Sequence, residues 1–143
     1  MALLALSLMT PSANADDKAD IKSLYKKVSA ALKNRDMKTV MSTSTADFKY
    51  RENGQVMDAK QTEEVMNKQF NTFKSVEEAV VIPEKIEIKG KTAIVQSLTK
   101  MLSTIGDQKD KSKSHKISTI GGTKDTLVKE KDGWKFKMIE TTS

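Results

Sequence analysis

The chain has 143 residues, a net charge of +6 and no cysteine, so disulfides, thiolate nucleophiles and cysteine-ligated metals are excluded. Its length and its 37% of hydrophobic residues fit one domain with a single core. The positive charge is almost all lysine, spread along the sequence, with arginine only at Arg35 and Arg51. Nucleic-acid readers usually gather arginine and exposed aromatics on one face, so we expect a solvated lysine surface and no nucleic-acid partner.

The N-terminus has the layout of a secretory signal peptide. Ala2–Met9 is an apolar run, too short to span a bilayer as a helix, and Ala13-Asn14-Ala15 is an A-x-A cleavage site followed at once by two aspartates. No basic residue precedes the run, and the alternative is an apolar N-terminal extension of a cytosolic protein. The small-residue site beside the abrupt change to charge favours cleavage. We expect residues 1–15 to be removed, residues 16–143 to form one secreted or periplasmic domain, and no transmembrane segment in it.

Three segments have the spacing of amphipathic helices. The apolar stripe of the first is Ile21, Leu24, Tyr25, Val28, Ala31 and Leu32. Asp36 is placed to cap a short second helix that carries Met37. Asp58, with Gln61 three residues later, predicts a capping box at the start of the third helix. The apolar stripe of that helix is Val65, Met66, Phe70 and Phe73.

Strands follow the helical segments. Phe48 and Tyr50 alternate with charged residues and predict a short strand before an Asn53-Gly54 turn. The segment from Val80 to Ile88 predicts a strand with an edge position or a bulge at Pro83, because proline lacks the amide donor.

Two long strands and a terminal hairpin complete the chain. We expect strands over about 92–104 and 114–131, joined by a polar tip, with a bulge or bend at Gly121-Gly122. Asp132-Gly133 between alternating segments predicts a hairpin turn. We expect the buried face of the last strand to carry Trp134, Phe136 and Met138.

This last segment also carries a resemblance. Asp125-Thr126-Leu127-Val128-Lys129, a short charged turn with glycine and then Trp134-Lys135 resemble the end of SnoaL-like proteins of the nuclear transport factor two-like superfamily. The resemblance covers about residues 17–142. It implies an α+β fold: three N-terminal helices packed on a strongly curved antiparallel sheet, a cone-shaped α+β barrel with an apolar cavity open at one end. Because the superfamily includes isomerases, dehydratases, cyclases and binding domains, the fold does not determine the function.

The chain departs from the catalytic pattern of the ketosteroid isomerase branch of this superfamily. Aligning that branch's helix-ending leucine with Leu32 places its catalytic tyrosine on Val28, which cannot donate a hydrogen bond. The branch's general base falls near Glu52, beside a turn where we expect solvent. We therefore expect no catalysis; if the chain is an enzyme, its candidates are Asp47, Tyr50 and Glu52.

The expected ligand-pocket residues are Tyr25, Phe48, Tyr50, Met66, Phe70 and Trp134. For Tyr25 we favour simple ring packing, with its hydroxyl at the rim. His115, the only histidine, lies among lysines near the hairpin tip, and we expect it to be solvated and idle. No metal ligand cluster or cofactor motif is visible, so we expect neither metal nor cofactor.

Three hypotheses follow. The first is a non-catalytic exported domain that binds a small apolar or amphipathic molecule in the cone or pairs as a homodimer through the open sheet face. The second is an isomerase, dehydratase or hydrolase of the same fold. The third is a structural dimerisation module with a filled cone. An open cone with a buried carboxylate would favour the enzyme, an open cone without one the binding domain, and a filled cone the structural module.

Overall fold

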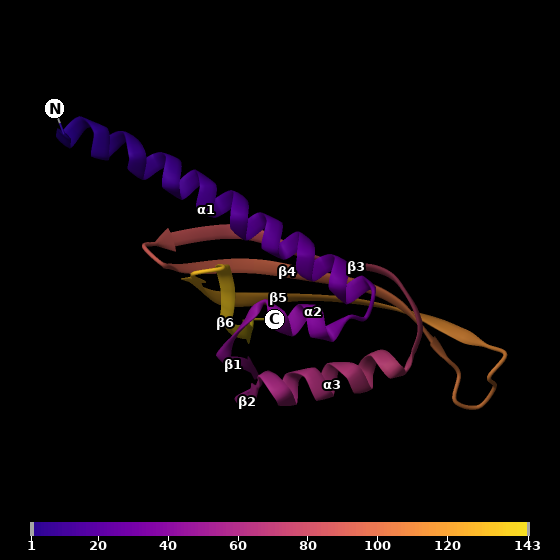
Figure 1. Ribbon diagram of the computed structural model, residues 1–143. Coiled ribbons are helices and arrows are strands. Elements are labelled where there is room, and N and C mark those ends of the chain that lie inside the picture. Colours follow the sequence, from indigo (N-terminus) through magenta and orange to yellow (C-terminus); the bar gives the residue numbers. More distant parts are fainter. Residues whose placement is uncertain (1, 143) are drawn as a thin grey trace.

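The computed structural model describes residues 2–142, with side chains from residue 15 onward. Within these residues, three helices and six strands follow one another (Figure 1). Their bounds are α1 Ala2–Lys33, α2 Met37–Ser42, β1 Ser44–Glu52, β2 Gln55–Asp58, α3 Ala59–Asn71, β3 Phe73–Lys89, β4 Thr92–Gly106, β5 Ser114–Glu130 and β6 Gly133–Thr141.

The six strands form one open sheet in the order β2-β1-β6-β5-β4-β3. All neighbours are antiparallel except β1 and β6, which are parallel. The α+β class is thus confirmed, but the expected antiparallel, barrel-like sheet is corrected: this sheet is mixed and not closed, with β2 and β3 at its edges. Strand β6 lies between β1 and β5, parallel to the first and antiparallel to the second.

The core lies between this sheet and the helices. The α1 stripe is confirmed: Ile21, Tyr25, Val28, Ala31 and Leu32 are buried, and Leu24 is partly buried against the core. They pack with residues of the sheet and of the other helices, including Met37, Phe48, Phe70, Val95, Leu127, Trp134 and Phe136.

Helix α1 continues without a break through the predicted cleavage site. It spans 32 residues from Ala2, and its N-terminal part extends beyond the sheet (Figure 1). Asp16, Asp17 and Asp20 therefore lie within the helix of the full chain and would form its first turns only after cleavage at Ala15. Among the described residues, no helix is long and apolar enough to cross a membrane.

Caps and turns agree closely with the sequence. The Asp36 side chain accepts a bond from the Thr39 amide, and Asp58 and Gln61 form the full reciprocal capping box. Asn53 and Gly54 both have positive φ in the predicted turn. The third-helix stripe needs correction, because Val65 is 48% exposed and Phe73 already belongs to β3.

Bulges change which side chains face the core. Pro83 lies in edge strand β3, and the β3–β4 register shifts between Pro83 and Lys85, so edge position and bulge are both confirmed. The glycine pair at 121–122 shows no register shift against β4. A shift at Thr126/Leu127 instead interrupts the β5–β6 pairing. As a consequence Ile139, not the expected Met138, joins Phe136 against the core.

Candidate functional site

A cluster of polar side chains, Tyr25, Ser97, Thr123 and Asp125, lies inside the fold; we call it the interior cluster. Asp125 is only 2% exposed and Tyr25 1%. The Tyr25 hydroxyl donates to Asp125 Oδ2. Ser97 Oγ donates to the same oxygen at 2.9 Å, and Thr123 Oγ1 donates to Asp125 Oδ1 at 2.7 Å. Three hydroxyls from three elements thus converge on one carboxyl group.

The sheet register explains how Asp125 comes to face the helices. Asp125 pairs with Val95 on one side and with Ile139 on the other, and Ile139 pairs with Tyr50. Paired residues of neighbouring strands share a face, so this row points toward α1. There the Tyr25 ring packs edge-on against Phe136, with centroids 5.3 Å apart, and its hydroxyl reaches the carboxyl group.

Burial dominates the electrostatics of the cluster. It raises the pKa of Asp125 against the hydrogen bonds from Tyr25, Thr123 and Ser97, which lower it. Burial also raises the pKa of Tyr25, and the Asp125 charge adds to that effect. The pKa of Tyr50 is raised by burial first, then by Glu52 and Asp125. Tyrosine therefore acts here as a neutral donor, and the carboxyl group takes up a proton more readily than in water.

The cluster is satisfied internally. No buried side-chain nitrogen or oxygen among the described residues lacks a hydrogen-bond partner. The prediction that the Tyr25 hydroxyl lies at the rim is wrong, because the hydroxyl is buried and donates to Asp125. A buried carboxyl group and a tyrosine are the components of acid–base chemistry in an apolar site. In this arrangement they are hydrogen-bonded to each other.

The residues that we expected to line a ligand pocket lie in or against the packed core. Tyr25, Phe48, Phe70 and Trp134 are members of the buried core, and Tyr50 and Met66 pack against it partly exposed. They belong to this core or pack against it, and neither of the two hollows described below includes any of them.

The enzyme candidates other than Tyr50 lie at the surface. The Asp47 side chain is 69% exposed, accepts from Thr45 Oγ1 at 2.8 Å and lies 3.9 Å from Lys137 Nζ. The Thr45 bond is the main reason why its pKa is lowered. Glu52 is exposed and lines a small hollow of about 190 Å³ with Asn53.

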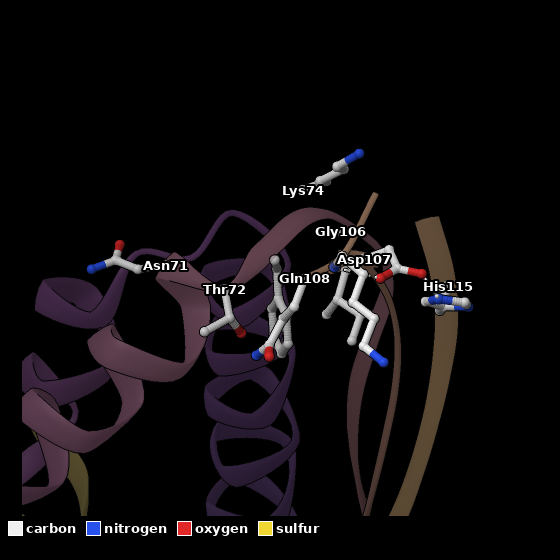
Figure 2. A pocket seen from close by; sticks show the side chains of 10 residues that line it. Asn71, Thr72, Lys74, Gly106, Asp107, Gln108 and His115 are labelled. Carbon is white, nitrogen blue, oxygen red and sulfur yellow. Dashed lines mark hydrogen bonds and ion pairs between the residues drawn. The ribbon is translucent and has the colours of Figure 1, made fainter. Parts of the chain in front are cut away.

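A larger hollow, which we call the end groove, lies beside the loop that joins β4 and β5 (Figure 2). Its volume is about 670 Å³. The lining residues are Asn71, Thr72, Phe73, Lys74, Ile105, Gly106, Asp107, Gln108, Lys109 and His115. They come from the α3–β3 junction, the end of β4, the hairpin loop and the start of β5.

The groove combines an apolar pair with polar walls. Phe73 and Ile105 are cross-strand partners, and Phe73 also packs against Phe70 of the core, with centroids 5.9 Å apart. Asp107 is directed toward His115, whose Nε2 lies 3.2 Å from Asp107 Oδ2 (Figure 2). Asp107 also accepts from the Lys109 amide at 2.8 Å. Two lysines, Lys74 and Lys109, line the groove against the single carboxylate Asp107, so the net charge of the lining is positive. The Lys74 ammonium donates to the Lys111 carbonyl at 3.3 Å.

The sequence reasoning missed Asp125 as a site residue, although Asp125 belongs to the motif that carried the resemblance. The signal was its alternation with Leu127, which places a carboxylate on the core side of a strand. Among the described residues no group of three or more His, Cys, Asp or Glu could hold a metal ion.

Comparison with known proteins defines the fold only. No family model and no curated protein matches the chain. A candidate scytalone dehydratase from Novosphingobium aromaticivorans superposes with a TM-score of 0.75 at 16% identity, covering 94% of this chain and 89% of that one.

Two further solved structures agree. A candidate dehydratase of the NTF2-like family from Streptomyces avermitilis has a TM-score of 0.73 at 14% identity, with 90% and 99% of the two chains covered. An NTF2-like superfamily protein from Salmonella enterica has a TM-score of 0.72 at 9% identity, with 91% and 92% covered.

Proposed function

We propose that this chain, which has the NTF2-like, cystatin-like fold, is an exported domain that binds a small amphipathic molecule without turning it over. The end groove is the observation that carries the proposal. Its volume of about 670 Å³ falls in the range of small-molecule pockets, roughly 300–1,000 Å³. Phe73 and Ile105 offer apolar contact, and Lys74 and Lys109 favour an anionic head group.

The interior supports binding over catalysis. Asp125 and Tyr25 are closed off from solvent and satisfy each other. A substrate would have to displace one of these hydrogen bonds before it met the carboxyl group. We therefore propose the end groove as the ligand site in place of the expected pocket around Tyr50 and Phe48. Phe73 lines this groove and also packs against Phe70 of the core.

Decanoate, with decanol as its uncharged counterpart, provides a test by isothermal titration calorimetry. We expect decanoate to bind more tightly than decanol. Ile105→Gln should weaken decanoate binding about tenfold, because partial loss of one buried aliphatic contact is worth roughly 1.4 kcal/mol. Val56→Gln, at an exposed valine of β2 that does not line the groove, should leave affinity unchanged. Equal affinity of all three proteins, or no binding of either probe, would contradict the proposal.

An acid–base enzyme is the second candidate, and it is favoured by the raised pKa of Asp125 beside Tyr25. Two structural relatives with dehydratase names give it further support. The test is a turnover screen with apolar ketones, enols and epoxides. Loss of a general base costs roughly 10²–10⁴ in rate, so activity that collapses in Asp125→Asn but not in Asp47→Asn would replace the binding proposal.

A homodimer through the outer sheet face is the partner that we propose. On that face Ile82 pairs with Leu98, and Lys100 pairs with Ile120. Ile120 is 65% exposed and Ile82 39%. Apolar side chains so exposed on a sheet lose contact with water when two copies pair. The third hypothesis, a structural dimerisation module, is supported by the same face and by the packed core, because neither hollow found among the described residues is lined by the expected pocket residues.

A further inference from the structure

Asp17, two residues after the predicted cleavage site, is tied to the far end of the chain. Its side chain is nearly buried, with 10% exposed. Asp17 Oδ1 accepts from Lys129 Nζ at 2.8 Å and from Trp134 Nε1 at 3.2 Å. The first residues of the expected mature chain are therefore held by the β5–β6 hairpin, more than a hundred positions later in the sequence.

We call the two bonds of Asp17, to Lys129 and to Trp134, the Asp17 anchor, and the opposite charges of Asp17 and Lys129 strengthen it. The hydrogen bond from Lys129 is the main reason why the pKa of Asp17 is lowered, and the Trp134 indole adds to it against the effect of burial. In turn Asp17 is the main reason why the pKa of Lys129 is raised, with smaller contributions from Asp20 and Asp16. Both partners are charged in the folded protein, so releasing Asp17 would separate an ion pair and leave an indole N–H unpaired.

The same segment is helical. Helix α1 passes through residues 13–17, so the Ala15–Asp16 peptide bond lies within continuous helix. Proteolysis of a folded chain requires local opening, and its rate follows the population of the opened state. Unwinding one helical turn after Ala15 would break the bonds of Asp17 to Lys129 and Trp134. The anchor therefore opposes the local opening that cleavage requires.

We propose that the Asp17 anchor protects the Ala15–Asp16 bond once α1 has docked, so that residues 1–15 are removed before folding or only very slowly afterwards. Before α1 docks, the Ala15–Asp16 bond is open to signal peptidase; hydrolysis consumes one water and leaves a carboxyl group on Ala15 and an amino group on Asp16. After docking, the anchor withholds the bond. The proposal depends on the predicted signal peptide and is independent of any ligand.

Cleavage of the full chain by purified signal peptidase in detergent micelles, followed by intact mass, tests this order. One sample is folded beforehand, and the other is diluted from urea into the enzyme. We expect the unfolded sample to be cut after Ala15 and the folded sample to be cut at least about 100-fold more slowly. Circular dichroism confirms that each folded sample is folded.

Matched variants separate the anchor from the helix. Asp17→Asn removes the charge, and Trp134→Phe removes the indole donor but keeps an aromatic ring. Each should raise the cleavage rate of the folded chain about tenfold, since a hydrogen bond to a charged group is lost. Glu64→Gln, which removes an exposed carboxylate on α3 that takes no part in the anchor, should change it less than twofold.

Each result is decisive. If the unfolded chain is not cut at Ala15, the signal peptide prediction is wrong and the proposal goes with it. If folded and unfolded chains are cut equally fast, the signal peptide stands but folding does not protect the bond. If Asp17→Asn and Trp134→Phe are cut as slowly as the wild type, helix continuity alone protects the bond and the anchor does not.

Discussion

Replacing Asp125 with asparagine removes the charge at the centre of the interior cluster and keeps the size of the side chain. Burial raises the pKa of Asp125 above its ordinary value, so the folded chain binds this proton more readily than the unfolded chain. The contribution of the group to stability is therefore fully present below the unfolded-state pKa of about 3.9 and is lost as pH rises through the folded-state pKa.

Urea unfolding followed by the fluorescence of Trp134, the single tryptophan, measures this effect from about pH 4 to about pH 8. We expect the free energy of unfolding of the wild type to gain on that of Asp125→Asn as pH falls. Taking the difference removes carboxylates such as Asp17, whose lowered pKa acts in the opposite direction. A difference that is constant, or that grows with pH, would refute the reasoning that burial outweighs the three hydroxyl donors.

Tyr25→Phe tests the donor side of the same contact. The ring can keep its edge-on packing against Phe136, but Asp125 loses one of its three hydroxyl donors. A hydrogen bond to a charged group is worth about 1.5–3 kcal/mol, and a domain of this size shifts in Tm by about 4 °C per kcal/mol. We expect Tm to fall by about 6–12 °C at neutral pH. A fall under about 2 °C would mean that the hydroxyl contributes no net stability.

Three further predictions concern packing, capping and assembly. Trp134→Ala should cost about 3–5 kcal/mol in urea unfolding because the indole is buried, and a cost below about 1 kcal/mol would contradict that burial. Asp58→Ala should cost about 1 kcal/mol, as the loss of an N-cap does, whereas no change would mean that the capping box with Gln61 does not stabilise α3. Ile120→Lys should convert a dimer to a monomer in analytical ultracentrifugation without lowering Tm; a wild-type monomer, or a variant that still dimerises, would exclude this face.

Local patterns predicted the elements that depend on local spacing. The α1 stripe, the Asp36 cap and the Asp58–Gln61 box were all readable because their partners lie within one or two turns. Strand β2 was missed, since its four residues are too few to show alternation.

The interior cluster could not be assembled from the sequence in the same way. Tyr25 and Asp125 are separated by 100 positions, and their meeting depends on the strand order and on how α1 crosses the sheet. Whether Met138 or Ile139 faces the core depends on a single register shift between β5 and β6, which no local residue pattern predicts. At Asp125 the sequence shows alternation with a buried residue, Leu127. That pattern predicts that the side chain is buried, but it does not predict its hydrogen-bond partners.

The parallel pairing of β1 with β6 has a consequence for how the chain folds. The last strand is the only link in the sheet between β1–β2 and the three long strands β3–β5 among the residues described. Contacts such as Thr141 to Arg51 span 90 positions. Joining the two parts of the sheet therefore depends on β6, whereas β3, β4 and β5 pair with neighbours in the sequence. Pairing at so large a sequence separation is slow to form. A chain shortened by β6 would contain two separate pieces of sheet, and circular permutants that place new ends inside β6 should be the least tolerated of all.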